Sequence, residues 1–307
     1  MKKYIVSDLH GNGEVYDSII GFLDNMYKKD DVKLYINGDL IDRGFDSMRM
    51  LRDVKSRDEG NGNIEIEYLA GNHELMMWDA YLKRNKETDM INPFCDWLNN
   101  GGCFVEGELQ EASKDEFHEY YRYISNLKIY NKFSETVNNE NILLVHAAAP
   151  KEIYDSSHLR LVDYKKDFTI YSSLWTREEE MEFLRNKDKI IGKDGYFTII
   201  GHTPVKEKPG FIYNNRENYL NIDGGCAYYS NGFFDVDHVP LVEIDDNKLN
   251  IIIFNHNNQI IDGYIFDKKT YKMNTIEINY YRRFLDSRFD NNGYNNKKLI
   301  KELKGIK

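Results

Sequence analysis

The chain has 307 residues, 41% hydrophobic and 30% charged, which suits one large globular domain or one domain with an extension. Its net charge of −10 argues against a basic groove for nucleic acid or an anionic membrane, although a local metal centre could still attract a phosphorylated substrate. The three cysteines, Cys95, Cys103 and Cys226, contain no CxxC pair and indicate no disulfide framework, which favours a reducing compartment.

The first residues predict neither export nor membrane insertion. The apolar run in MKKYIVSDLH stops at Asp8, whereas a signal peptide needs roughly 7–15 apolar residues. The strongest apolar run is IIIF at 251–254, far short of the ~18 residues of a membrane span. We therefore expect a soluble cytoplasmic protein without a membrane partner.

The first quarter of the chain alternates between strand and helix patterns. The predicted strands are 3–7, 33–37 and 64–70, and the predicted helices are 14–28, 46–54 and 74–84. Such a β-α-β-α-β-α order is typical of a layered sheet with helices on its faces.

The remainder divides into a helical insert, a strand-rich half and a tail. The insert covers 86–126, and a short helix is predicted near 177–186. The predicted strands that follow the insert are 128–133, 141–146, 196–201, 218–223, 241–244 and 249–254. We expect a domain over 1–264 and an Asn-, Tyr- and Lys-rich extension over 265–307, read as an edge hairpin plus a helix.

Chemically informative residues follow the predicted strands directly. The first three strands end in DLHG, GDLIDRG and GNHE, and later strands end in a histidine, in GHTP and in DGG. Ligands bind outside the carboxyl ends of strands in open α/β sheets, so these loops can converge on one site. They supply six candidate metal ligands: Asp8, His10, Asp39, Asn72, His146 and His202.

Carboxylate, amide and imidazole ligands together suit Mn²⁺, Fe or Zn²⁺. Six are too many for one catalytic ion with open positions, whereas two ions that share Asp39 would fit. His73 would then be free to protonate a leaving oxygen as general acid, with Asp42 orienting its imidazole. Arg43 and Arg177 could hold phosphate oxygens through bidentate hydrogen bonds.

These motifs, in this order, resemble the calcineurin-like metallophosphoesterases, most closely the phosphoprotein-phosphatase branch in its bacterial and phage Ser/Thr phosphatase form. The resemblance covers residues 1–245, and WLNNGG (97–102) and SLWTRE (173–178) also look like segments of bacterial phosphatases. It implies an α/β fold, a four-layer αββα sandwich of two mixed sheets flanked by helices. It also implies a first metal on Asp8, His10 and Asp39, a second on Asp39, Asn72, His146 and His202, a His73–Asp42 acid pair and a phosphate contact at Arg43.

The leading hypothesis is a metal-dependent phosphoric ester hydrolase, a Ser/Thr phosphoprotein phosphatase. A hydroxide that bridges two ions, with Mn²⁺ favoured over Fe or Zn²⁺, would attack a phosphorylated protein or small phosphoester directly. His73 would act as the acid, and Arg43, Arg177 and Asn72 would contact the substrate.

Two alternatives remain open. The first is a symmetrical dinucleoside tetraphosphate hydrolase or another nucleotide phosphoesterase. Sequences of the tetraphosphatase branch typically have Ala in place of Asp42 and lack the Thr203-Pro204 pair, so both features favour the phosphatase. The second is a non-catalytic binding relative, which predicts a lost ligand or acid, and none is lost.

Two positions depart from the family pattern. Ala147 follows the strand-ending histidine where glycine is usual, and Phe45 follows DRG where proline is common. The first is expected to alter packing beside the second metal, and the second to alter the pocket rim. Glu74 is as consistent with a residue that starts a helix as with a catalytic residue. Asp223 is equally consistent with a turn residue and with a residue that supports the metal ligands.

Overall fold

The computed structural model describes most of the chain. The described residues are 1–28, 31–83, 92–164, 168–177, 195–206, 208–215, 218–231, 238–257, 259–267 and 269–285. Apart from Arg177, the helix predicted near 177–186 lies outside these ranges, as does the tail beyond residue 285.

The larger sheet has seven strands in the order β12-β11-β10-β9-β1-β2-β3. Its parallel strands are β1 (Lys2–Val6), β2 (Val32–Asn37) and β3 (Glu65–Leu69). An antiparallel meander continues from β1 through β9 (Val239–Asp245), β10 (Lys248–Phe254), β11 (Ile260–Phe266) and β12 (Thr270–Lys272).

The second sheet has five strands in the order β4-β5-β6-β8-β7 and is also mixed. Its strands are β4 (Tyr130–Val137), β5 (Glu140–Val145), β6 (Tyr196–Ile200), β7 (Ile212–Asn214) and β8 (Tyr219–Asn221). The central strands β5, β6 and β8 run parallel to one another, and β4 and β7 pair antiparallel at the two edges.

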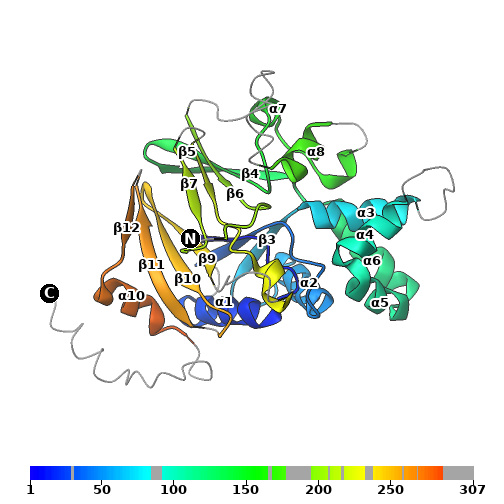
Figure 1. Cartoon of the computed structure of the whole chain (residues 1–307), viewed down its shortest axis with the longest axis horizontal. Helices are drawn as coiled ribbons and strands as arrows, with labels where there is room; N and C mark the ends of the chain where they lie inside the picture. The colour runs from blue at the N-terminus through cyan, green and yellow to red at the C-terminus, as the bar shows by residue number, and fades with distance from the viewer. Residues whose placement is uncertain are drawn as a thin grey trace.

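Alternating side chains give the larger sheet two buried faces. Ile5, Tyr35 and Leu69 belong to the apolar cluster shared with the second sheet, whereas their neighbours Tyr4 and Leu34 belong to the cluster beneath the helices. The period of two along each strand produces this division. The two sheets therefore pack face to face, and the predicted architecture of two mixed sheets flanked by helices is confirmed (Figure 1).

Helices α1 (Gly13–Met26) and α2 (Ser47–Asp58) lie along the larger sheet, and a group of four helices lies to one side (Figure 1). This group comprises α3 (Asn72–Lys83), α4 (Pro93–Trp97), α5 (Cys103–Glu111) and α6 (Lys114–Ser125), with a π-helical turn over Leu98–Gly102. Helix α3 is the helix predicted after the third strand, and α4 to α6 lie within the helical insert predicted over 86–126. Short helices α7 (Lys151–Asp155) and α8 (Phe168–Trp175) lie beside the second sheet.

The described part of the tail joins the larger sheet. Strand β11 continues to Phe266, β12 forms a hairpin with it at the sheet edge, and α10 (Thr275–Arg282) follows. Tyr281 donates a hydrogen bond of 2.9 Å to the buried Glu243 of β9. The expected hairpin and helix are therefore present, while the proposed boundary after residue 264 stays a prediction.

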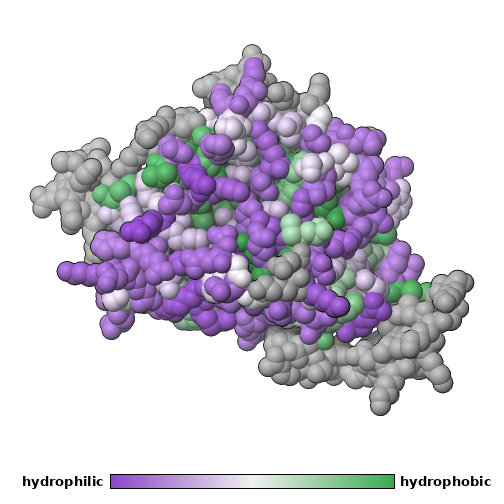
Figure 2. All heavy atoms as spheres, turned by 180° about the vertical axis from the view of Figure 1, so that it is seen from behind, coloured by the Kyte–Doolittle hydropathy of each residue, from purple (hydrophilic) through white to green (hydrophobic). Residues whose placement is uncertain are grey.

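The surface of the described residues is largely hydrophilic on the face shown in Figure 2, with only small separate apolar areas. Within the described ranges, no helix combines the length and apolarity needed to cross a bilayer.

Candidate active site

The predicted site residues lie where strands of both sheets end. Asp8 and His10 follow β1, and Asp39 follows β2. The remaining candidate ligands come from the start of α3 and from the ends of β5 and β6. All six are buried, with exposed fractions between 0% and 5%: Asp8, His10, Asp39, Asn72, His146 and His202.

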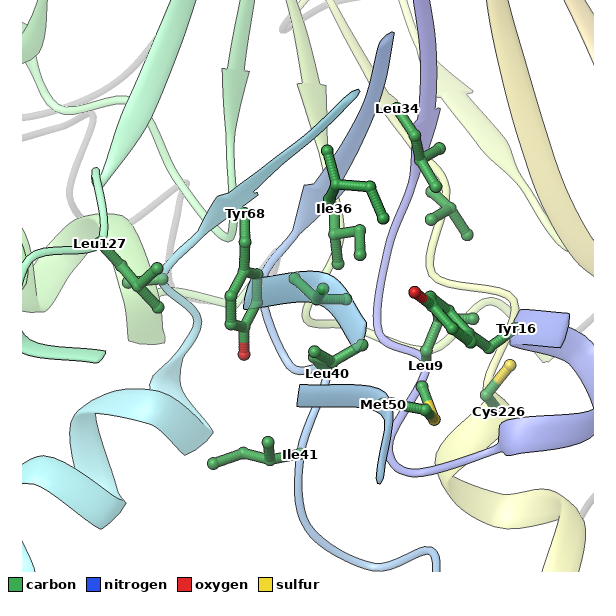
Figure 3. Close-up of a cluster of buried hydrophobic side chains, with 14 of the residues drawn as sticks. Leu9, Tyr16, Leu34, Ile36, Leu40, Ile41, Met50, Tyr68, Leu127 and Cys226 are labelled. Atoms are coloured by element: carbon green, nitrogen blue, oxygen red, sulfur yellow. The ribbon is translucent and has the colours of Figure 1, made fainter. Parts of the chain in front are cut away.

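Apolar residues inside the same loops anchor these polar side chains. Leu9 separates Asp8 from His10, and Leu40 and Ile41 separate Asp39 from Asp42. The three apolar side chains are fully buried and point into the core beneath the larger sheet (Figure 3). Their burial fixes the loops, so the intervening polar side chains are held at the strand ends.

Asp39 lies between two groups of possible metal ligands. Its Oδ2 is 3.4 Å from His10 Nε2 and 3.9 Å from His73 Nε2. Its Oδ1 is 3.5 Å from His146 Nε2. Ligand atoms of Asp39, His10 and His73 lie within 4.8 Å of one another, and the same holds for Asp39, His146 and His202. One carboxylate thus serves both groups, as a bridging ligand must.

Asn72 belongs to the second group by position. Its Oδ1 is 3.1 Å from His146 Nε2 and 2.9 Å from His202 Nδ1. Asp8 lies beside both groups without belonging to either. Its carboxylate accepts hydrogen bonds from Ser7 Oγ and from the backbone N–H of His202, the latter at 3.1 Å.

The ionisation tendencies of the candidate ligands differ: burial, with the charges of Asp223 and Asp39, raises the pKa of Asp8 well above its ordinary value, whereas the other ionisable ligands favour the metal-binding forms. Burial lowers the pKa of His10 and His146, and with His146 nearby it lowers the pKa of His202 to about 3. Burial opposes ionisation of Asp39, but the surrounding imidazoles hold its pKa below the ordinary range. Neutral imidazoles around an ionised carboxylate are the protonation states that a divalent transition metal requires.

The backbone at the site is unusual. Six of the eleven non-glycine residues with positive φ in the described ranges are predicted site residues: Asp8, His10, Asp39, Asp42, Arg43 and His202, with φ between 45° and 71°. Side chains disfavour this region, which is retained only where the surrounding structure enforces it. Glycines allow the close packing: a Cβ on Gly71 would lie 2.2 Å from Asp39 Oδ1, and one on Gly201 would lie 2.1 Å from Asp8 Oδ2.

His73 and Asp42 form a buried pair. His73 Nδ1 donates to Asp42 Oδ2 over 2.7 Å, and the two residues are 1% and 0% exposed. Burial acts to lower the pKa of His73, but the charges of Asp39 and Asp42 outweigh it and raise the pKa above its ordinary value. The arrangement therefore favours a protonated imidazole whose Nδ1–H is held by Asp42.

The two predicted arginines differ in placement. Arg43 lies within the site, with Nη1 3.3 Å from His10 Nε2 and Nη2 3.1 Å from His73 Nε2. Arg177 is exposed, and its charge acts to lower the pKa of His146 and His202. Its neighbouring segment reaches the site, since the Trp175 carbonyl oxygen is 3.2 Å from His202 Nε2.

The departures from the family pattern lie at the expected places. Ala147 is buried directly after His146, and its N–H donates to the Ser173 carbonyl over 2.8 Å. Phe45 is 73% exposed two residues after Arg43, and its ring centroid is 4.3 Å from that of Phe104. An exposed aromatic pair therefore lies close in sequence to the phosphate-binding candidate.

Asp223 combines both roles that the sequence left open. Its Oδ1 accepts the Gly225 N–H over 2.8 Å, which closes a turn. It is also buried near Asp8 and Asp39, and burial raises its pKa to about 7.

Glu74 is the buried residue whose importance the sequence understated. Its Oε2 accepts backbone N–H groups of Asp39 and Gly71 at 2.9 and 2.7 Å, and its Oε1 accepts the Tyr68 hydroxyl. Burial, aided by the charge of Asp39, raises the pKa of Glu74 to about 7. The side chain therefore ties the loop after β2 to the loop after β3.

We expect Glu74→Gln to destabilise the protein by about 2–3 kcal/mol, because an amide –NH₂ would replace one oxygen that accepts from donors in a fully buried site. Urea unfolding of the metal-free protein measures the change. Glu59→Gln is the control: that side chain is 56% exposed and, among the described residues, its salt bridge is to Lys55, so its loss should be below about 0.5 kcal/mol. Equal midpoints for the two variants would contradict the role of Glu74.

Known proteins provide an independent comparison. The sequence matches the calcineurin-like phosphoesterase family over residues 1–258. A symmetrical bis(5'-nucleosyl)-tetraphosphatase of Salmonella paratyphi B is 33% identical over 99 residues, 31% of this chain and 32% of the relative, and that of Salmonella typhimurium matches equally. The chain thus aligns with only about a third of these relatives' length.

A solved structure shares the fold at low identity. A protein serine/threonine phosphatase from Saccharomyces cerevisiae matches with a TM-score of 0.52 and 15% identity, over 83% of this chain and 80% of that one. A cold-active protein-tyrosine phosphatase from a psychrophilic Shewanella matches with a TM-score of 0.46 and 14% identity, over 89% of this chain and 80% of that one. Because the family match extends over most of the chain, the protein belongs to the calcineurin-like phosphoesterases.

Proposed function

We propose that this protein is a two-metal phosphomonoesterase that acts on phosphoserine or phosphothreonine in proteins. Membership of the phosphoesterase family makes it a hydrolase of phosphoric esters. The observation that carries the finer proposal is the buried His73–Asp42 pair, whose imidazole lies next to Asp39, the residue that two groups of possible ligands share. An acid in that position serves a leaving group that departs as an alkoxide, as serine and threonine do.

The donor set fits two divalent ions. His10, Asp39 and Asp8 would hold one ion, and Asp39 with Asn72, His146 and His202 would hold the other. Mn²⁺ is our first choice, with Fe or Zn²⁺ also compatible with nitrogen and oxygen ligands. When bound, the ions would supply an activated water and neutralise phosphate charge.

The protein's own groups then bind the ester and move one proton. Arg43 Nη1 and Nη2 lie beside His10 and His73 and can hold two phosphate oxygens. Arg177 is exposed and adds positive charge that acts on His146 and His202. His73 gives its Nε2 proton to the leaving oxygen, while Asp42 holds the opposite ring nitrogen and stabilises the protonated ring.

A covalent route through Cys226 is disfavoured. Burial, with the charges of Asp223 and Asp8 nearby, raises the pKa of Cys226 far above its ordinary value. The thiol would therefore be protonated at neutral pH and a poor nucleophile. Direct attack by water accounts for hydrolysis without it.

A second candidate is hydrolysis of a symmetrical dinucleoside tetraphosphate. The partial match to the Salmonella enzymes favours it, and the exposed pair Phe45–Phe104 offers rings on which a base could stack. We rank it second because Asp42 is present and hydrogen-bonded to His73, whereas the tetraphosphatase pattern typically has alanine there.

A substrate panel distinguishes the two. We expect the Mn²⁺-loaded protein to hydrolyse a phosphoserine peptide with a kcat/KM at least about tenfold above those for a phosphotyrosine peptide, a symmetrical dinucleoside tetraphosphate and a 2′,3′-cyclic nucleotide. Exhaustive chelation should remove the activity, and added Mn²⁺ should restore it. If the protein preferred the tetraphosphate, the proposed substrate class would be wrong, whereas the proposed metal site would stand. Full activity after chelation would contradict the two-metal mechanism.

A further inference from the structure

The WLNNGG segment (97–102) contacts the acid pair through Trp97. The indole Nε1–H donates to Asp42 Oδ2 over 2.9 Å, and the same oxygen accepts the His73 Nδ1–H over 2.7 Å. Trp97 is 0% exposed. Because an indole can only donate, Oδ2 is the acceptor of that bond, and it also accepts the Nδ1–H when His73 carries the proton that an acid needs.

The Asp42 carboxylate depends on that one oxygen. Asp42 Oδ1 is buried, and within the described residues it has no hydrogen-bond partner. Two donors on Oδ2 therefore fix the rotation of the carboxylate about its Cβ–Cγ bond. Without the indole N–H, only the His73 contact would resist rotation, and the imidazole that His73 presents to the site would lose its fixed direction.

The glycines of the same segment allow the contact. A Cβ on Gly102 would lie 2.4 Å from Trp97 Cε2, so a larger residue there would displace the indole. Gly101, at φ +107°, accepts the Arg43 N–H with its carbonyl over 2.9 Å, and a Cβ there would lie 2.6 Å from Arg43 Cγ. One turn thus abuts both the acid pair and the phosphate-binding candidate.

We propose that Trp97 is a positioning residue for acid catalysis: its N–H fixes the Asp42 carboxylate, which in turn aims His73 at the leaving oxygen. The Gly101–Gly102 turn presses the indole into place and holds the Arg43 backbone. This inference rests on the proposed role of His73 in phosphoester hydrolysis. It also gives the helical insert a chemical function, because the turn is the part of the insert that meets the site.

Simple core packing is the competing explanation. The Trp97 ring centroid is 5.7 Å from that of Tyr81 and 6.1 Å from that of Phe94, so the side chain also fills space. Trp97→Phe retains an aromatic ring for these contacts and removes the N–H donor. Trp78→Phe is the matched control, since Trp78 is 4% exposed in the same apolar cluster.

The activity test compares two leaving groups in the Mn²⁺-loaded full-length protein. We expect Trp97→Phe to lower kcat for a phosphoserine peptide about 10- to 100-fold, with KM within about twofold, because the serine alkoxide needs a proton. For p-nitrophenyl phosphate, whose leaving group needs little acid help, kcat should change less than about threefold. Trp78→Phe should keep both rates near wild type.

A second readout needs no turnover. In Zn²⁺-loaded protein labelled with ¹⁵N-histidine, the downfield His73 Nδ1–H resonance is identified by its loss in His73→Asn. We expect Trp97→Phe to move or broaden this resonance, and Trp78→Phe to leave it in place.

The outcomes separate this inference from the function on which it rests. Equal losses on both substrates with a lowered melting temperature would show a packing role and overturn the proposal. Unchanged peptide turnover would also overturn it, whatever the resonance does. If wild-type protein hydrolysed no phosphomonoester, the proposed function would fail, and an unmoved resonance in Trp97→Phe would then overturn the positioning role by itself.

Discussion

Asp39→Asn is expected to lower phosphopeptide turnover by on the order of 10³-fold and to reduce the bound metal from two ions per chain to one or fewer. Mutation of a residue that hydrogen-bonds to a metal ligand typically lowers metal affinity or activity about 10- to 100-fold. Loss of a ligand that two ions share should therefore lower turnover by a larger factor. The asparagine keeps an oxygen on one side only. Since Oδ2 faces His10 and Oδ1 faces His146, one group would meet a neutral amide oxygen and the other an –NH₂ group, which cannot bind a metal ion.

Metal content measured by plasma mass spectrometry, together with kcat, checks this result. Asp17→Asn is the control, because that side chain is 48% exposed and pairs with Arg49 on the surface. Two ions per chain and more than about a tenth of the activity in Asp39→Asn would show that Asp39 does not bridge two metals.

The site could be predicted because its residues lie next to local signals. Each candidate ligand immediately follows a strand pattern or begins the helix after one, and parallel strands bring their carboxyl ends together. The apolar residues within the motifs mark the loops as anchored: Leu9, Leu40 and Ile41 are fully buried. Sequence order and strand geometry were therefore sufficient to assemble Asp39 with its histidines.

Glu74 and Trp97 could not be assessed in this way. Glu74 has the sequence context of an ordinary first-turn acid, and its importance comes from buried N–H groups on a loop 35 residues earlier. Trp97 meets Asp42 across 55 residues through a π-helical turn. No local pattern encodes either contact, because each joins residues that are far apart in the sequence and meet only in the folded chain.

Strand assignment failed where the pattern is interrupted. β11 carries Asp262 and Gly263 in its middle, both of which disfavour strands, and it lies across the expected domain boundary. Pairing with β10 along most of its length overrides that weak propensity. The three-residue strands β7 and β12 are too short for alternation to be recognised.

His73→Asn should lower kcat for a phosphoserine peptide about 10²- to 10⁴-fold while KM stays within about threefold and two metal ions remain bound. Asn removes the transferable proton but keeps a polar side chain of smaller size beside Asp42. Retention of both metal ions would distinguish this variant from Asp39→Asn, because His73 is not one of the assigned metal ligands. His158→Asn, an exposed position outside every motif, serves as the control.

The leaving group provides the decisive comparison. If His73 is the acid, the loss should shrink as the leaving alcohol becomes more acidic, and p-nitrophenyl phosphate should be the least affected substrate. Asp42→Asn should lower kcat with the same dependence on the leaving group but by a smaller factor, since it weakens the acid without removing it. The double variant should be no worse than His73→Asn alone, because residues that act as one unit give non-additive losses. Additive losses would mean that Asp42 acts independently of His73, and a uniform loss across leaving groups would assign His73 to metal or phosphate binding instead.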